Sequence, residues 1–204
     1  MKWMLIVVTM IIAGFGFANM LTDPGFEDTG SSAWSPYVST SAIQYDFDET
    51  GPKHEGSQSL HITWTSTTEY NVFDAKQYFA VTPGETLEAS IYAEVPLVVN
   101  SSPMEGYLEI FYKDVNGTDI GSLQSAHVGS VTSDWAQLSV SGIIPDNTVT
   151  AMYRIVIFGG PQSTGGAILF DDASLQIPEP STGLLALFAS GVIASIRRFV
   201  TRRG

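Results

Sequence analysis

The sequence has no cysteine and few basic residues, and both shortages limit what the protein can be. Without cysteine, the chain forms no disulfide, no thiolate metal site and no thiol nucleophile. All 21 acidic residues lie between Asp23 and Glu179, and only four of the nine basic residues lie among them. Such an acidic stretch lacks the basic patches that bind phosphate groups, so we exclude nucleic acid as a partner.

Recognisable catalytic motifs are also missing. The chain has no Gly-x-Ser-x-Gly motif and no Glu-x-Asp-x-x-Glu motif, and its three histidines show no metal-ligand spacing. Asp46 and Asp48 would share one face of a strand, but we expect residues 46–49 to form a solvated loop. The sequence therefore predicts a protein that is not an enzyme.

The N-terminus is typical of a secretory signal peptide. Lys2 supplies a positive charge, the stretch from Trp3 to Phe17 is apolar, and the small residue Ala18 follows. We expect signal peptidase to remove residues 1–18; an uncleaved N-terminal anchor is the alternative.

The C-terminus combines three features in order. Pro178-Glu179-Pro180 comes first, a charge-free apolar run follows, and a basic end begins with Arg197 and Arg198. The prolines keep the tripeptide extended, and the apolar run favours a transmembrane helix over about residues 182–200. The arginines favour the cytoplasmic side, which places the rest of the protein outside. A plain tail anchor is the alternative.

This arrangement resembles the PEP-CTERM sorting signal of exopolysaccharide-producing Gram-negative bacteria, over residues 177–204. The resemblance implies cleavage near the motif by an exosortase, which is a membrane cysteine protease. It also implies a protein that is anchored transiently in the inner membrane and then passes to the cell surface or the extracellular matrix.

Residues 19–176 are predicted to form one all-β domain. Apolar and polar residues alternate with the period of a strand in several stretches, and turn signals such as Asn116-Gly117 lie between them. The clearest of these stretches are residues 60–64, 87–95, 107–113, 149–157 and 167–176. This pattern predicts an antiparallel β-sandwich, with Trp34 and Trp135 in its core.

Several short segments of this domain resemble galactose-binding-like jelly-roll modules, which include the carbohydrate-binding modules found beside xylanases and glucanases. The segments are Asp23-Pro24-Gly25-Phe26-Glu27 with Trp34, then residues 56–62, 83–87, 133–135 and 170–175. The resemblance implies a jelly roll that associates with extracellular polysaccharide.

The same resemblance implies one structural Ca²⁺ that joins the N-terminal stretch to the last strand. Glu27 and Asp171 stand at the matching positions, and the Gly25 carbonyl and the Glu55 side chain could complete the oxygen ligands. The alternative is that Glu27 is merely exposed and Asp171 caps a loop. Regular alternation would place Asp172 on the face opposite Asp171.

Polar strand faces that carry aromatic rings predict a polysaccharide-binding surface, since sugars stack on aromatic side chains. Tyr92 with Glu88 lies on one such face, and Tyr107 with Glu109 lies on another that we expect nearby. Further candidates are Arg154, Tyr37, Trp64 and Tyr70. The alternative functions are a purely structural matrix protein without a sugar pocket and, third, a glycan-active hydrolase or lyase.

Overall fold

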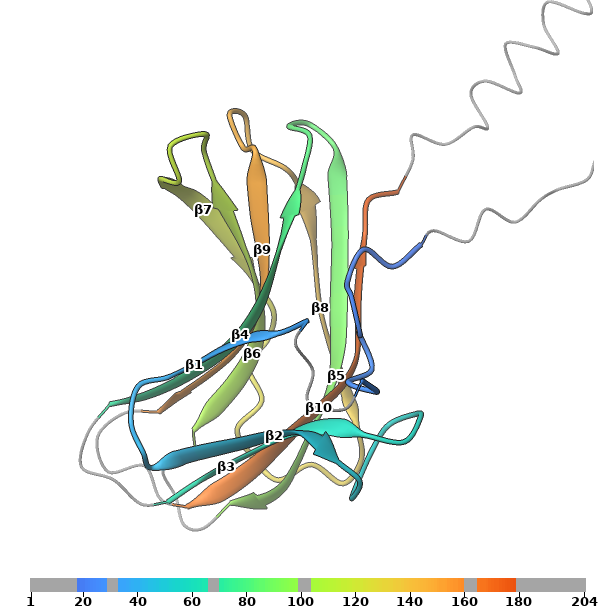
Figure 1. Ribbon diagram of the computed structural model, residues 1–204, viewed down its shortest axis with the longest axis vertical. Coiled ribbons are helices and arrows are strands. Elements are labelled where there is room, and N and C mark those ends of the chain that lie inside the picture. Colours follow the sequence, from blue (N-terminus) through green and yellow to red (C-terminus); the bar gives the residue numbers. More distant parts are fainter. Residues whose placement is uncertain (1–17, 29–32, 66–69, 99–103, 160–164, 179–204) are drawn as a thin grey trace, which may run out of the picture.

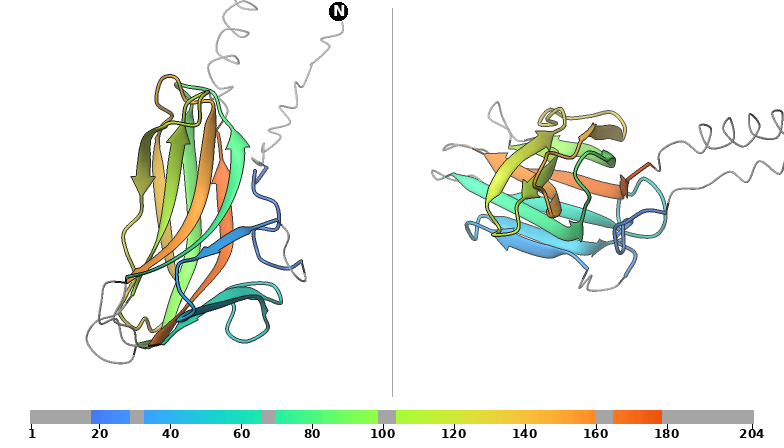
Figure 2. Two further views of the ribbon diagram at one scale, coloured as in Figure 1. Left: turned by 60° about the vertical axis from the view of Figure 1, so that its left-hand side comes forward. Right: turned by 90° about the horizontal axis from the view of Figure 1, so that it is seen from above.

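Ten β-strands make up the regular structure of the computed structural model, which describes residues 18–28, 33–65, 70–98, 104–159 and 165–178. Sheet A has the order β1-β4-β9-β6-β7, with β1 (Ser35–Val38), β4 (Asn71–Ala80), β9 (Thr150–Gly159), β6 (Glu105–Lys113) and β7 (Asp119–Gln124). Sheet B has the order β2-β3-β10-β5-β8, with β2 (Ile43–Glu49), β3 (Ser59–Trp64), β10 (Gly166–Gln176), β5 (Thr86–Val98) and β8 (Ala136–Ile143). All described pairings are antiparallel, and the two sheets pack face to face (Figures 1 and 2), which confirms the predicted β-sandwich.

The core lies between the sheets and follows from the alternation of the strands. Every second residue of β5 from Leu87 to Val95 is buried, whereas the residues between them face outward. Each fully buried large apolar side chain contributes about 1.5–3 kcal/mol relative to an exposed one. Trp34 is buried as expected, and its ring meets that of Tyr153 edge-on with centroids 5.8 Å apart.

A β-bulge in β10 changes which of its side chains face the core. Before the bulge, even-numbered residues such as Phe170 face inward, and after it odd-numbered residues such as Leu175 do so. The pairing with β5 shifts between Asp171 and Ser174, and Asp172 has a φ of 49°. A bulge inserts one residue into one strand and re-aims the side chains there.

The first described residues are fixed to the end of β10. Met20 N donates to Leu175 O at 2.9 Å, and the Asn19 side chain donates to Ala173 O at 2.8 Å. Ala173 N in turn donates to Pro24 O at 2.8 Å. The two ends of the domain therefore lie side by side, as Figure 1 shows.

Some of the sequence-based expectations are wrong. Residues 46–49, expected to be a solvated loop, belong to β2, and Phe47 of this strand packs into the core. Trp135, expected in the core, is only half-buried, and its ring meets that of His54 edge-on at 5.9 Å.

The predicted signal peptide and C-terminal helix lie outside the described residues, except for Ala18. Within the part of the chain that the structure describes, no helix is long and apolar enough to cross a membrane.

Gly106 marks a close approach of the two sheets, and we predict that Gly106→Ala destabilises the fold. A Cβ at this position would lie 2.9 Å from Phe170 Cζ and 3.2 Å from Ile168 Cδ1, both in the opposite sheet. Overpacking of a core costs about 1–3 kcal/mol. Urea unfolding should therefore show a loss of this size.

Gly51→Ala is the matched control for this prediction. The atoms nearest to its added Cβ belong to the flexible side chain of Glu49, with Oε1 at 2.8 Å. We expect a change of less than about 0.5 kcal/mol. Equal losses of stability in the two variants would contradict the close approach at Gly106.

Candidate functional site

An ion cluster lies on the outer face of sheet A, where β4, β9 and β6 run side by side. The register pairs Lys76 with Arg154 and Arg154 with Glu109, which places them in one row. Arg154 Nη1 donates to Glu109 Oε2 at 2.7 Å, and its Nη2 donates to Asp74 Oδ2 at 2.8 Å. Lys76 Nζ donates to Asp74 Oδ1 at 3.0 Å, and Gln124 Nε2 donates to Glu109 Oε1 at 2.8 Å.

The two carboxylates of this ion cluster are almost fully buried, since Asp74 and Glu109 are each 4% exposed. Burial of Arg154 opposes its charge, but the nearby Asp74 and Glu109 outweigh this effect and raise the pKa of Arg154. The guanidinium therefore stays charged. Two cations, Arg154 and Lys76, compensate the two buried carboxylates, as buried charges require.

Aromatic side chains surround the ion cluster on the same face. Tyr37 of β1 pairs with Asp74, and another row runs from Tyr78 of β4 across Met152 to Phe111 of β6. Tyr37 is 53% exposed and Tyr78 is 57% exposed. These two rings therefore present open surface beside the charged groups.

Tyr107 adds a further ring to this face. Its ring stacks on that of His127 with centroids 4.4 Å apart, and His127 Nδ1 lies 2.7 Å from Glu105 Oε2. Burial, together with the charges of Glu109 and Glu105, raises the pKa of Tyr107 despite the opposing effect of Arg154. The phenol therefore remains neutral.

The two polar faces predicted to bind polysaccharide lie on different sheets, so the expectation that they are near each other is wrong. Tyr107 and Glu109 belong to sheet A, and the register places the further candidate Arg154 beside Glu109. Glu88 and Tyr92 lie on β5 in sheet B. The structure thus separates the candidate residues into two groups.

On sheet B, the Tyr92 ring is covered by the imidazole of His54, which comes from the loop between β2 and β3. The ring centroids are 3.7 Å apart and the planes differ by 14°. Glu88 instead lines an open pocket of about 420 Å³ with Ala89, Ser90, Gln137, Ser139, Val140, Ser141, Ser174 and Gln176. None of these described lining residues carries an aromatic ring.

The β2–β3 loop is held by two carboxylates. Asp171 Oδ2 accepts hydrogen bonds from the backbone N atoms of His54 at 2.8 Å and Glu55 at 3.2 Å. Glu27 Oε1 accepts from the backbone N of Ser57 at 2.7 Å and from the next backbone N at 3.2 Å. Both carboxylates therefore cap this loop, which for Asp171 is the alternative that the sequence left open.

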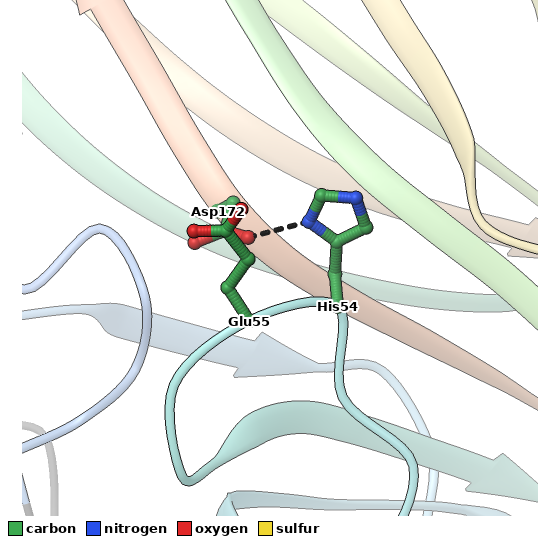
Figure 3. A group of neighbouring side chains, drawn as sticks. All are labelled: His54, Glu55 and Asp172. Atoms are coloured by element: carbon green, nitrogen blue, oxygen red, sulfur yellow. Dashed lines mark hydrogen bonds and ion pairs between the residues drawn. The ribbon is translucent and has the colours of Figure 1, made fainter.

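Asp171 and Asp172 both lie close to Gly25, so the expectation that Asp172 points to the opposite face is wrong. A Cβ on Gly25 would lie 4.0 Å from Asp171 Oδ1 and 3.8 Å from Asp172 Oδ1. His54 Nδ1 and Asp172 Oδ2 are 2.6 Å apart, with Glu55 beside them (Figure 3). The bulge in β10 produces this convergence.

The environment of Asp171 disfavours its ionised form. Burial raises the pKa of Asp171 to about 6, an effect that backbone hydrogen bonds reduce and the charge of Asp172 increases. Gly25 and the backbone N atoms of the β2–β3 loop lie beside this carboxylate.

Sequence reasoning missed Asp74, Tyr78 and Phe111 as members of the face on sheet A. A usable signal existed, because Asp74 and Tyr78 are an even number of residues apart and would share one face of a strand. Phe111 likewise has the same parity as Tyr107 and Glu109.

Residues 176–203 match the PEP-CTERM protein-sorting motif, so the chain carries the sorting signal that its C-terminus predicted. This motif implies export and membrane-associated sorting by an exosortase. Pro178 follows β10 closely, whereas Glu179, Pro180, Arg197 and Arg198 lie outside the described residues. No curated protein matches the sequence.

The fold is that of jelly-roll carbohydrate-binding modules. TmCBM61 in complex with β-1,4-galactotriose is 16% identical with a TM-score of 0.55, over 79% of this chain and 99% of that one. The CBM22-1 xylan-binding domain from Paenibacillus barcinonensis Xyn10C is 20% identical with a TM-score of 0.53, over 79% and 97%. The enzymatically active domain of bacteriophage CBA120 tailspike protein 4 is 11% identical with a TM-score of 0.57, over 78% of this chain and 21% of that one. At these identities, the likeness shows the fold alone.

We predict that the metal-free protein becomes more stable as the pH falls from 7 to 5. Asp171 has a folded-state pKa of about 6, above its ordinary 3.8, so the folded state binds this proton more tightly than the unfolded chain. The resulting stability is gained as the pH falls through 6, by about 1 kcal/mol between pH 7 and 5. Urea unfolding at pH 7 and pH 5, in the presence of a chelator, measures this difference in the free energy of unfolding.

Asp171→Asn is the control for this pH dependence, because asparagine does not titrate. Histidines also gain protons in this range, so the quantity to follow is the difference between the wild type and Asp171→Asn. That difference should change by about 1 kcal/mol between pH 7 and 5. Parallel curves for the two proteins would contradict the raised pKa of Asp171.

Proposed function

We propose that the domain binds extracellular polysaccharide without catalysis, through the outer face of sheet A. The observation that carries this proposal is the group of rings around the ion cluster, of which Tyr37 and Tyr78 are more than half exposed. Sugar rings stack on such flat apolar faces, while neighbouring polar groups bind their hydroxyls. Tyr107 and Arg154 supply hydrogen-bonding groups at this place.

The charges of the face favour a neutral glycan. Asp74, Glu109, Arg154 and Lys76 already compensate one another, so none of them calls for an ionic partner. The chain as a whole has a net charge of −12, which repels polyanions at longer range. We therefore place uncharged polysaccharides ahead of acidic ones.

The same contacts favour binding over hydrolysis. A glycosidase generally needs one carboxyl group that donates a proton and a second that acts as nucleophile or base. On this face Asp74 and Glu109 both accept hydrogen bonds from the single guanidinium of Arg154, so both carboxyl groups are already engaged within the ion cluster. The covered ring of Tyr92 favours a purely structural role for that residue. The exposed rings of Tyr37 and Tyr78 on sheet A favour ligand binding instead.

We propose the following route for the exported protein. Signal peptidase removes residues 1–18, and the apolar helix near residues 182–200 holds the precursor in the inner membrane of a Gram-negative cell. Exosortase then cuts near Pro178, and the domain reaches the cell surface or the exopolysaccharide matrix. The matched sorting motif and the position of Asn19, which is already part of the fold, support this order of events.

Calorimetric titration of the full chain against a panel of neutral and acidic polysaccharides tests the proposal. The detergent that keeps the chain soluble must lack a sugar headgroup, which would compete for the site. We expect saturable binding of one neutral glycan. Tyr37→Ala and Tyr78→Ala should each weaken it by about tenfold, because each removes a stacking surface of roughly 1.4 kcal/mol.

Tyr92→Ala is the matched control, since it removes the same type of residue from sheet B, where His54 covers the ring. Its glycan affinity should equal that of the wild type, and thermal unfolding should show that all variants are folded. The proposal fails if no glycan binds, or if Tyr92→Ala loses as much affinity as Tyr78→Ala.

We also propose that one structural Ca²⁺ joins Glu27 and Asp171, with the Gly25 carbonyl as a further ligand. Support comes from the approach of both side chains to Gly25, whose added Cβ would lie 3.6 Å from Glu27 Cγ and 4.0 Å from Asp171 Oδ1. Such an ion would stabilise a domain that has no disulfide.

Ca²⁺ should raise the free energy of unfolding of the chelator-treated protein by about 2.7 kcal/mol at a hundredfold excess over its dissociation constant. Glu27→Gln should lose most of this gain, because it removes one charged ligand. Glu88→Gln, on the outer face of β5, should retain it. An equal response to Ca²⁺ in both variants would remove Glu27 from the site.

A further inference from the structure

We propose that His54, Glu55 and Asp172 bind one divalent transition-metal ion of the zinc class on the outer face of sheet B. Their ligand atoms are one imidazole nitrogen and two carboxylate oxygens, which all lie within 4.8 Å of one another (Figure 3). This site is separate from the proposed polysaccharide-binding face, which lies on sheet A. The two proposals therefore stand or fall independently.

The imidazole decides the class of cation. Ca²⁺ and Mg²⁺ take hard oxygen ligands, whereas zinc and its neighbours combine imidazole nitrogen with carboxylate oxygen. Ligand atoms around a tetrahedral zinc ion lie roughly 3.3 Å apart. His54 Nδ1 and Asp172 Oδ2, now 2.6 Å apart, would need to separate by less than about 1 Å to admit the ion.

The surrounding contacts hold two of the three ligands in place. The His54 ring stacks on Tyr92 at 3.7 Å, and its backbone N donates to Asp171, so both the ring and the backbone are fixed. Asp172 is fixed by the bulge in β10. Glu55 is exposed, and its side chain can move to complete the site.

Negative charge at this place exceeds positive charge. Glu55 of the β2–β3 loop lies close to Asp171 and Asp172 of β10. Among the described residues, these three carboxylates form one ion pair, between Asp172 and His54. This contrasts with sheet A, where Arg154 and Lys76 compensate the buried carboxylates. A divalent cation would supply the missing positive charge.

The ion would join elements that are far apart in the sequence. It would link the β2–β3 loop to the bulge of β10 and, through the ring of His54, press that loop onto Tyr92 of β5. Tyr92 pairs with Gln137, which lines the open pocket on sheet B, so the ion would lie near one end of that pocket.

A zinc titration of the full chain tests this inference. The protein, made without a histidine tag, is stripped with a chelator and titrated separately with Zn²⁺, Ca²⁺ and Mg²⁺ by calorimetry and tryptophan fluorescence. We expect one Zn²⁺ per chain and a change in emission, because the Trp135 ring lies 5.9 Å from that of His54. His54→Gln should weaken Zn²⁺ binding by more than about tenfold.

Two control variants distinguish this site from other histidines and from the proposed Ca²⁺ site. His127→Gln removes another histidine that pairs with a glutamate, Glu105, and should leave Zn²⁺ binding unchanged. Glu27→Gln should weaken the response to Ca²⁺ but not the response to Zn²⁺. If His54→Gln does not fold, Asp172→Asn provides the same test. Absent Zn²⁺ binding, unchanged affinity in the His54 and Asp172 variants, or displacement of Zn²⁺ by equimolar Ca²⁺ would each overturn the inference.

Discussion

The buried carboxylate of Asp171 is the interaction on which the outer face of sheet B depends. It accepts backbone hydrogen bonds from His54, Glu55 and Asp172, which partly offset the cost of burying its charge. Because these bonds fix the β2–β3 loop against β10, the His54 ring covers Tyr92 and closes part of sheet B. Tyr37 and Tyr78 on sheet A have no such cover and are more than half exposed.

The sequence predicts the long inner strands of the fold but not the short outer ones. β5 and β9 alternate clearly, because each lies between two neighbours and buries a full inward face. β1, β2 and β7 are edge strands, and β7 is exposed along most of its length. β2 does alternate, because Ile43, Tyr45 and Phe47 are separated by polar residues. Residues 46–49 looked like a solvated loop because three of the four are acidic.

The candidate sites depend on non-local pairings and on one local irregularity that alternation cannot reveal. Tyr92 and Tyr107 look equivalent along the chain, yet they belong to opposite sheets, since only the strand order decides this. The row of Lys76, Arg154 and Glu109 requires the register of three strands. A single inserted residue in β10 brings the Asp172 side chain to His54. The sequence prediction assumed regular strand geometry and therefore placed Asp172 on the opposite face of the sheet.

Both faces carry Asp and Glu side chains. On sheet A these pair with Arg154 and Lys76, whereas near His54 they pair with no lysine or arginine among the described residues, and this contrast favours different ligands. Buried ion pairs add little to stability compared with apolar packing, so the cluster around Arg154 is poorly explained as a stabilising device. The cluster holds the guanidinium in place beside the Phe111 ring, and under the proposed function this order would lower the entropy lost on ligand binding. At His54, by contrast, carboxylates gather without a lysine or arginine ion pair among the described residues, and such a place favours a cation.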